Sequence, residues 1–281
     1  MARPAVEPIL EAQLPEVALF LQAHLNPALD AAAWQAALRP TWSSSAPNHG
    51  FLLRDAGVLV GVIGAMYAQR RIAGHVQGIC NITSWCVLDT HRQHSMRLAM
   101  AVVGQPGWHF TDFSPTPVVG STLKFLKFTE LDDRLVLHPN LPRLGGGKVL
   151  TRPDDVAGAL CGDDLQAWHD HRQYPWLQQL ALGDGSQWCH VIYKRRQMRN
   201  LPVAGLLHAS QPALLQRHFG RLRSHLLARG HLFTTHEYRL LPATSWPARV
   251  LSGYNRKVYR SDTLQPGHID YLYSETVSMD L

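Results

Sequence analysis

The strongest constraint on the fold is a run of two long strands followed by a helix and a third strand. The segments Val58–Arg70 and Ile79–Leu88 are rich in β-branched and aromatic residues, which is typical of strands. Apolar residues at helical spacing follow over Ser95–Val103, and a short strand is expected over Trp108–Phe113. This order predicts an antiparallel hairpin joined to one strand-helix-strand crossover.

The flanking segments predict more helices and a related second half. Helices are expected before the hairpin, over Pro15–His24 and Ala31–Leu38, and after the crossover, over Val118–Phe125. A strand, strand, helix, strand order then recurs over Trp188–Lys194, Leu201–His208, Pro212–Ala228 and Leu232–Leu241. The chain is therefore expected to hold two similar halves.

The boundary between these halves is expected where the composition shifts to Pro, Gly, Arg and Asp. This shift runs from Asn140 to Val156 and contains Gly145, Gly146 and Gly147. It predicts one domain over residues 1–140 and a second over residues 141–281.

The composition is that of an ordinary folded protein. Of the 281 residues, 46% are hydrophobic and 17% are charged, and no apolar run is long enough for a membrane span. The first residues, from Met1 to Glu11, lack a basic segment leading into an apolar one, so no secretory signal is expected and we place the protein in the cytoplasm. The net charge of +6 favours an anionic partner, although many enzymes are mildly basic.

Cysteine and histidine usage gives no sign of a metal centre or a disulfide framework. The four cysteines are scattered and none forms a CxxC pair, and the sixteen histidines are not clustered with carboxylates at ligand spacing. We therefore expect no metal site and no permanently bound cofactor.

One polar segment between a strand and a helix has the character of an anion site. Arg92, Ser95 and Arg97 fall where the predicted Ser95–Val103 helix begins. Free backbone N–H groups and the helix dipole at such a start favour a pyrophosphate, and a small residue such as Ser95 lets it come close. Arg97 either contacts a phosphate or points away.

This segment resembles the acyl-CoA-binding motif of the GNAT superfamily, R/Q-x-x-G-x-G/A, with Arg92, Ser95 and Arg97 at its three positions. The order of elements over about Glu7 to Asp132 is also similar to that family. The resemblance implies an α+β fold, with a mixed, mostly antiparallel sheet flanked by helices, present twice, the second copy being degenerate. It implies acyl-CoA as co-substrate, held by Val87, Leu88, Arg92, Gln93, His94, Ser95, Met96 and Arg97.

The implied activity is transfer of an acyl group from acyl-CoA to an amine or hydroxyl of a small-molecule acceptor. Two family features are missing. Leu123 stands where many members have a tyrosine that protonates the leaving thiolate, and the Ile79–Leu88 strand carries no carboxylate to act as a base. The remaining candidates for catalysis on or near the two central strands are Ser84, Cys86, His91 and Asp112.

Several alternatives remain open. Cys86 is either a nucleophile activated by His91 or His94, or a buried structural cysteine. The donor is acyl-CoA, a carrier-protein thioester or an aminoacyl-tRNA, and an inactive GNAT-like regulatory module is also compatible with the missing residues. Partners beyond the small acceptor would then be an acyl carrier protein or tRNA, and the oligomeric state is left open.

The second half also carries the most basic stretch of the chain. A patch that binds an acidic acceptor, a carrier protein or RNA is feasible there, with a solvated surface as the simpler interpretation. The loop before the predicted Pro212–Ala228 helix lacks the R-x-x-G pattern, so the second half is expected to bind no acyl-CoA. The basic side chains are Lys194, Arg195, Arg196, Arg199, Arg217, Arg221, Arg223 and Arg229.

Overall fold

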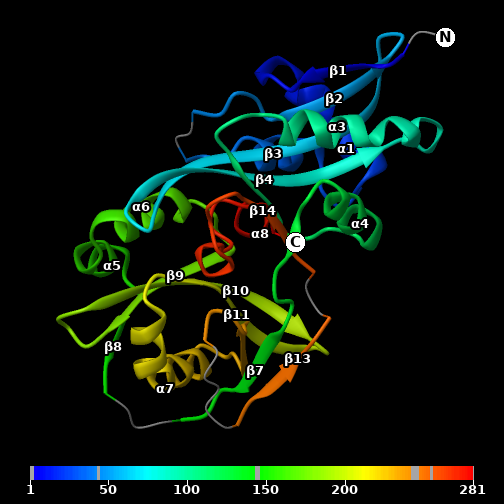
Figure 1. Ribbon diagram of the computed structural model, residues 1–281. Coiled ribbons are helices and arrows are strands. Elements are labelled where there is room, and N and C mark those ends of the chain that lie inside the picture. The colour runs from blue at the N-terminus through cyan, green and yellow to red at the C-terminus, as the bar shows by residue number, and fades with distance from the viewer. Residues whose placement is uncertain (1–2, 43–44, 143–145, 242–246, 254–255, 281) are drawn as a thin grey trace.

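The computed structural model describes residues 3–42, 45–142, 146–241, 247–253 and 256–280, which form two seven-stranded sheets with the C-terminal segment between them (Figure 1). The first sheet has the order β1 (Ala5–Pro8), β2 (Gly50–Asp55), β3 (Val58–Ile72), β4 (His75–Val87), β5 (His109–Asp112), β14 (Val258–Arg260) and β6 (Thr129–Glu130). The second has the order β13 (Arg249–Leu251), β7 (Leu135–Pro139), β12 (Phe233–Glu237), β11 (Leu201–Ala209), β10 (Trp188–Met198), β9 (Leu177–Gly183) and β8 (Lys148–Leu150).

Most of the helices pack on the faces of the sheets, and the last of them lies between the two sheets. They are α1 (Leu14–His24), α2 (Ala31–Leu38), α3 (Ser95–Val103), α4 (Pro117–Phe125), α5 (Pro153–Ala159), α6 (Gly162–His171), α7 (Pro212–Ala228) and α8 (Glu275–Ser278), with 3-10 turns η1 (Glu11–Gln13), η2 (Asp89–His94) and η3 (Pro266–His268). Side-chain caps mark the starts of α2, α4 and α8. For example, Thr116 Oγ1 accepts the Val119 N–H ahead of α4, and Pro117 occupies its first turn.

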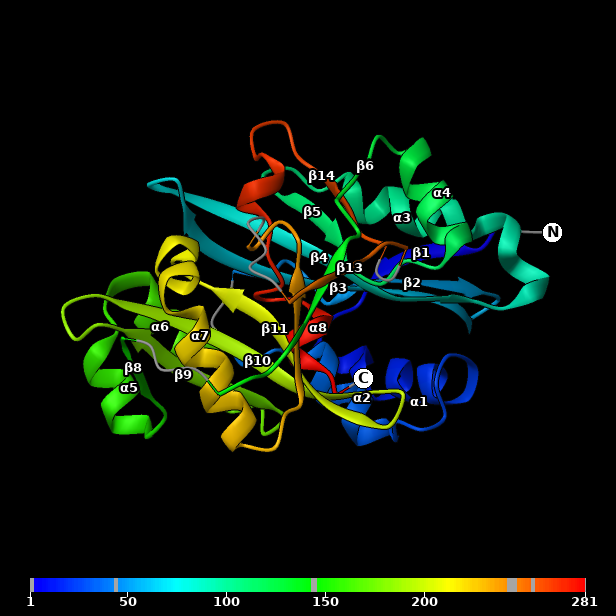
Figure 2. The same cartoon turned by 90° about the horizontal axis from the view of Figure 1, so that it is seen from below.

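Helices lie on both faces of the first sheet. In Figure 2, α1 and α2 lie on one side of it and α3 and α4 on the other. Leu98, Ala99 and Val102 of α3 pack against Ile63 and Ile82 in the core under that helix. A separate core forms between the second sheet and α7. Each sheet therefore has its own apolar layer, as expected for two similar halves.

The two sheets exchange strands across the middle of the chain. Strand β7 precedes residue 140 but pairs with β12 and β13 of the second sheet. Strand β14 comes from near the C-terminus but pairs with β5 and β6 of the first sheet. The division into residues 1–140 and 141–281 stays a prediction, and Gly145, at its centre, lies outside the described residues.

A C-terminal segment, residues 266–279, lies between the sheets, and we call it the strap. Trp176 Nε1 donates to the Val277 carbonyl at 2.8 Å from the second half, and the Glu275 N–H donates to Asn81 Oδ1 at 3.1 Å in the first. Buried strap side chains such as Tyr271 and Leu272 join the largest core of the molecule. The strap thus contributes to the packing of both sheets.

The fold prediction is confirmed: two mixed, mostly antiparallel sheets flanked by helices. The helices Ser95–Val103 and Pro212–Ala228 have the expected bounds, and Ile79–Leu88 is the greater part of β4. The sequence did not predict β1, α5, α6 or the exchange of β7 and β14. Within the described residues, no helix is both long and apolar enough to cross a membrane.

Candidate functional site

The first sheet opens where β4 and β5 stop pairing. These strands are parallel over three residue pairs, the last being Asn81 with Thr111. Beyond that pair β5 ends at Asp112, whereas β4 continues to Val87 alongside β3. The ends of the two strands diverge and leave space between them.

A β-bulge in β4 lies at the same place. The register between β3 and β4 shifts between Val62 and Gly64, so Ser84 and Trp85 have no paired residue on β3. Ser84 has a φ of 51°, a conformation that costs free energy for a residue with a side chain. Bulges re-aim backbone groups out of the ladder and are over-represented near active sites.

A cavity of about 830 Å³ adjoins the end of β4 beyond this point. Its α4 wall is formed by Val118, Val119 and Thr122, and its opposite wall comes from the end of β4 and from η2 and α3. Of the residues predicted to hold an acyl donor, these line the cavity: Val87, Leu88, Arg92, Gln93, Ser95 and Met96. His94 and Arg97 do not line it, and the Arg97 guanidinium instead donates to the Pro4 carbonyl at 2.6 Å.

The start of α3 differs from an open phosphate-binding loop. Residues 89–94 form the 3-10 helix η2, and the Ser95 N–H already donates to the Arg92 carbonyl. Arg92 is exposed and pairs with Asp89 at 2.8 Å. The side chains around the cavity can still meet an anion, but part of the backbone N–H set expected from the motif is used within the protein.

A buried leucine occupies the position where the family resemblance led us to expect a tyrosine acid. Leu123, at the expected position of the acid, is fully buried in the core under α4 and is absent from the cavity lining. Phe125 is 80% exposed at the end of the helix. No tyrosine lines the described part of this cavity, so a proton for a leaving thiolate has no tyrosine source here.

Cys86 and His91 do not form a nucleophile-base pair. Cys86 lines the cavity, and its Sγ donates to the His24 carbonyl at 3.5 Å, while burial raises the pKa of the thiol. His91 is directed elsewhere: Nε2 lies 3.0 Å from Asp55 Oδ2 and Nδ1 lies 2.8 Å from Thr90 Oγ1. The neutral thiol is a poor nucleophile.

Asp112 is buried beside a second carboxylate that the sequence did not single out, Glu275 of the strap. Ser114 links them, because its N–H donates to Asp112 Oδ1 at 3.1 Å and its hydroxyl donates to Glu275 Oε1 at 2.9 Å. Glu275 is 2% exposed, and its Oε2 is buried with no hydrogen-bond partner among the residues that the structure describes. The same residue is anchored to β4 through Asn81.

The environment of this pair favours a shared proton. Burial raises the pKa of Glu275 to about 7, against the opposing hydrogen bond from Ser114. Burial first, and then the charge of Glu275, raise the pKa of Asp112 well above its usual range. Two buried carboxylates close together cannot both ionise readily, so the pair holds a proton near neutral pH. No sequence pattern links positions so far apart in the chain.

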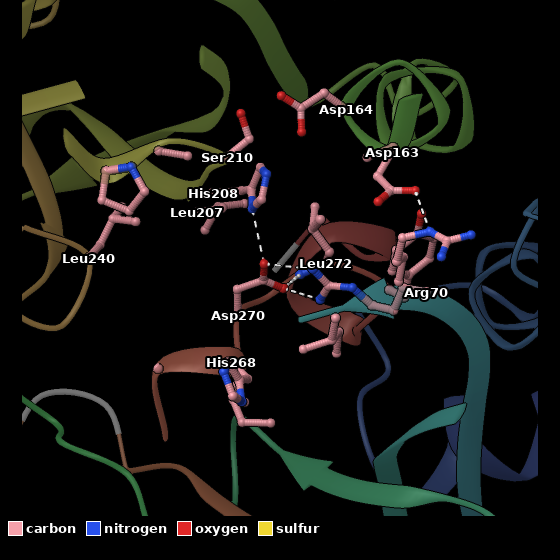
Figure 3. Close-up of a pocket in the computed structure, with 18 of the residues that line it drawn as sticks. Arg70, Asp163, Asp164, Leu207, His208, Ser210, Leu240, His268, Asp270 and Leu272 are labelled. Atoms are coloured by element: carbon pink, nitrogen blue, oxygen red, sulfur yellow. Dashed lines mark hydrogen bonds and ion pairs between the residues drawn. The ribbon is translucent and has the colours of Figure 1, made fainter. Parts of the chain in front are cut away.

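A second cavity, of about 420 Å³, lies between the two halves (Figure 3). Arg70 of β3 makes two hydrogen bonds to Asp270 of the strap, at 2.5 and 2.9 Å, and His208 Nδ1 lies 3.1 Å from Asp270 Oδ2. Burial alone would raise the pKa of Asp270, but the charge of Arg70 and the hydrogen bonds hold it well below its usual range. Asp270 is therefore an ionised carboxylate between two partners.

The basic stretch of the second half surrounds a hollow of about 410 Å³. Arg195, Arg196 and Arg229 line it together with His231. Arg223, by contrast, is 2% exposed and donates to the Pro139 carbonyl, so it is not part of a surface patch. Binding of a carrier protein or RNA at these arginines stays a prediction.

The fold is that of GCN5-related N-acetyltransferases, arranged in tandem. A scan of protein-family models and a search of curated proteins find no match. Among solved structures, a GCN5-related N-acetyltransferase from Anabaena variabilis is similar with a TM-score of 0.62 at 10% identity, over 92% of this chain and 72% of that one. One from Kribbella flavida gives a TM-score of 0.57 at 14% identity, over 92% and 70%.

A third similar structure is N-myristoyltransferase of Saccharomyces cerevisiae with bound myristoyl-CoA and inhibitors. It gives a TM-score of 0.50 at 12% identity, over 97% of this chain and 85% of that one. At such identities the likeness is one of fold, and the resemblance inferred from the sequence is confirmed at that level. What the site does must be argued from its own residues.

Proposed function

We propose that the protein transfers an acyl group from acyl-CoA to an amine, with the donor in the 830 Å³ cavity of the first sheet. The observation that carries the proposal is the coincidence of that cavity with the end of the β4–β5 pairing and the β4 bulge. A narrow thiol-bearing arm fits between diverging strands, and unpaired peptide groups at a bulge can bind the thioester oxygen. The structural neighbours, among them an enzyme crystallised with myristoyl-CoA, support this choice of donor.

The proposed chemistry needs a proton acceptor more than a proton donor. The amine nitrogen bonds to the thioester carbon, the nitrogen loses a proton, and the C–S bond then breaks to release the CoA thiolate. We assign proton acceptance to the Asp112–Glu275 pair, in which burial raises both pKa values and which lies at the end of the β4–β5 pairing rather than in the lining of the cavity. Proximity and carbonyl polarisation supply much of the remaining rate, so the absent tyrosine is compatible with activity.

This assignment revises the candidates for catalysis. Asp112 keeps a place through its contact with Ser114, and Ser84 contributes through the bulge rather than through its hydroxyl, which lies 3.3 Å from Thr83 Oγ1. His91 is held by Asp55 and Thr90, and Cys86 has a thiol whose pKa is raised, so neither is assigned a chemical role.

The test is a calorimetric titration of acetyl-CoA and a long-chain acyl-CoA into the wild type and two matched variants. Ser95→Glu places a carboxylate at the cavity wall, whereas Ser121→Glu places one on the exposed face of α4 outside it. We expect Ser95→Glu to weaken binding at least about tenfold, roughly 1.4 kcal/mol, and Ser121→Glu to leave it unchanged. Equal binding by all three proteins would place the donor elsewhere.

Turnover is tested separately. CoA release from the acyl-CoA that binds best is followed with a panel of primary amines, because a binding-competent but inactive protein would give titration heat and no release. Such a result would favour a regulatory module over an enzyme.

A further inference from the structure

The cavity between the halves presents a histidine that is oriented by an ion pair. His208 belongs to the end of β11, and its side chain is 9% exposed. Its Nδ1 faces the ionised Asp270 carboxylate, which Arg70 holds from the other side. A carboxylate only accepts hydrogen bonds, so the contact with Asp270 puts a proton on Nδ1, and in the tautomer with a single ring proton Nε2 is an acceptor.

The Nε2 atom of His208 is open to the cavity. It has no hydrogen-bond partner among the described residues, and it is not fully buried. In Figure 3 one ring nitrogen of His208 is joined to Asp270 and the other points away from it. A side chain nine-tenths buried thus turns a lone pair toward the cavity.

The charges around the cavity are mostly paired, with one exception. Arg239 pairs with Glu237 at 2.6 Å, and Arg71 lies 3.9 Å from Asp163. Asp164 lines the same cavity from the start of α6 and has no hydrogen bond or ion pair within the described part of the chain. In Figure 3 its carboxylate lies on the same side of the view as Ser210 and His208.

Two acceptors are therefore left for a ligand, His208 Nε2 and the Asp164 carboxylate, beside the Ser210 hydroxyl and His268 Nε2. We propose that this cavity is a binding site for a small ligand that carries a primary amino group. An ammonium group can donate to either acceptor and balances the charge of Asp164, whereas a carboxylate or phosphate would meet lone pairs on both. The volume of about 420 Å³ accommodates a short aliphatic diamine.

This site is distinct from the proposed donor cavity. The two cavities share no lining residue. On β3 this cavity is lined by Gln69 and the residues after it, whereas the β4 bulge lies opposite Val62 to Gly64. From Gln69 to Val62 is about 23 Å along an extended strand. The inference therefore stands whether or not the protein transfers acyl groups.

The experiment compares three probes of one chain length by calorimetry: 1,4-diaminobutane, its fully N-methylated bis-quaternary analogue and adipate. The diamine donates N–H groups, the quaternary probe has charge without donors, and adipate has the opposite charge. We expect saturable binding of the diamine, binding of the quaternary probe at least about tenfold weaker, and none of adipate. Absence of saturable diamine binding, or equal binding of all three, would overturn the proposal.

Two matched variants locate the site. Asp164→Asn removes the free carboxylate at constant size, and Asp154→Asn removes an exposed carboxylate from the first turn of α5, outside the cavity. We expect the first change to weaken diamine binding at least about fivefold and the second to leave it unchanged. The ring resonances of His208 should shift on diamine addition in the wild type. Unchanged affinity of the Asp164→Asn variant for the diamine, or unmoved His208 resonances, would show that the diamine does not bind in this cavity.

Discussion

The two carboxylates of the strap, Asp270 and Glu275, occupy comparable places in the two halves and have opposite properties. Each contacts a sheet near the end of a three-pair parallel ladder: Asp270 meets His208 beyond the β11–β12 ladder, and Glu275 meets Asn81 at the last pair of the β4–β5 ladder. Asp270 meets Arg70 and His208, and its pKa falls, whereas Glu275 meets Asp112, and its pKa rises to about 7. The strap thus supports a fixed ion pair between the two halves and a titratable group against the first sheet.

Each of the two sheets also contains a β-bulge, and the two bulges can be compared. In the first sheet the register shift lies next to Ser84, and in the second it lies between Ile192 and Tyr193, opposite the segment that contains Leu207. A cavity adjoins each bulge. In the first half it continues along η2 and α3, and in the second the side chains of His208 and the strap line it. A shared framework therefore sets where a site forms, and the side chains set what it binds.

The largest expected effect on stability comes from breaking the ion pair of Asp270 with Arg70. Asp270→Asn leaves Arg70 buried without its counter-charge and weakens the bond to His208. We expect the free energy of unfolding at neutral pH to fall by about 3–5 kcal/mol, measured by urea denaturation. Asp262→Asn, an exposed change shortly before the strap, is the control. A loss of less than about 1 kcal/mol would show that the ion pair contributes little.

The raised pKa of Glu275 predicts that the stability of the folded protein depends on pH. Because the folded-state pKa of Glu275 is raised from 4.5 to about 7, the folded state binds a proton that the unfolded state has released in this window, and stability falls as pH rises through it. Glu275→Gln removes this contribution. Relative to wild type, the variant should gain about 3 kcal/mol between pH 4.5 and pH 7.5. Parallel stability profiles for the two proteins would contradict a raised pKa.

Much of the fold was predictable because helices and strands carry local signals. The apolar spacing of Leu98, Ala99 and Val102 reflects burial against one sheet face, so the sequence predicts the bounds of the helix Ser95–Val103 correctly. The exchange of β7 and β14 was not predictable, since both are short and a strand's sequence does not specify which of two similar sheets it joins.

The candidate site shows the same limit. That several residues between Val87 and Met96 line one cavity could be predicted, because a strand-to-helix connection is contiguous in sequence. Glu275 was missed because it approaches Asp112 and Asn81 only through tertiary packing of the strap. Likewise, His208 and Asp270 have unremarkable local sequences, and their pairing exists only once the halves are packed together.

The smallest expected effect concerns Cys86. If proton acceptance belongs to the Asp112–Glu275 pair and the amine attacks directly, Cys86→Ser should change the rate of CoA release by less than about threefold, under 1 kcal/mol in activation free energy. Intact-protein mass spectrometry after mixing with acyl-CoA should show no acyl adduct on the wild type. An adduct that disappears in Cys86→Ser would instead establish a covalent route.

The most direct test of the difference between the halves is hydrogen exchange of backbone amides with and without saturating acetyl-CoA. We predict slowed exchange over residues 84–97, at the bulge, η2 and the start of α3, and no change over residues 206–214, at the end of β11 and the start of α7. Protection of residues 206–214 with none at residues 84–97 would overturn this prediction, because it would place the acyl donor in the second half.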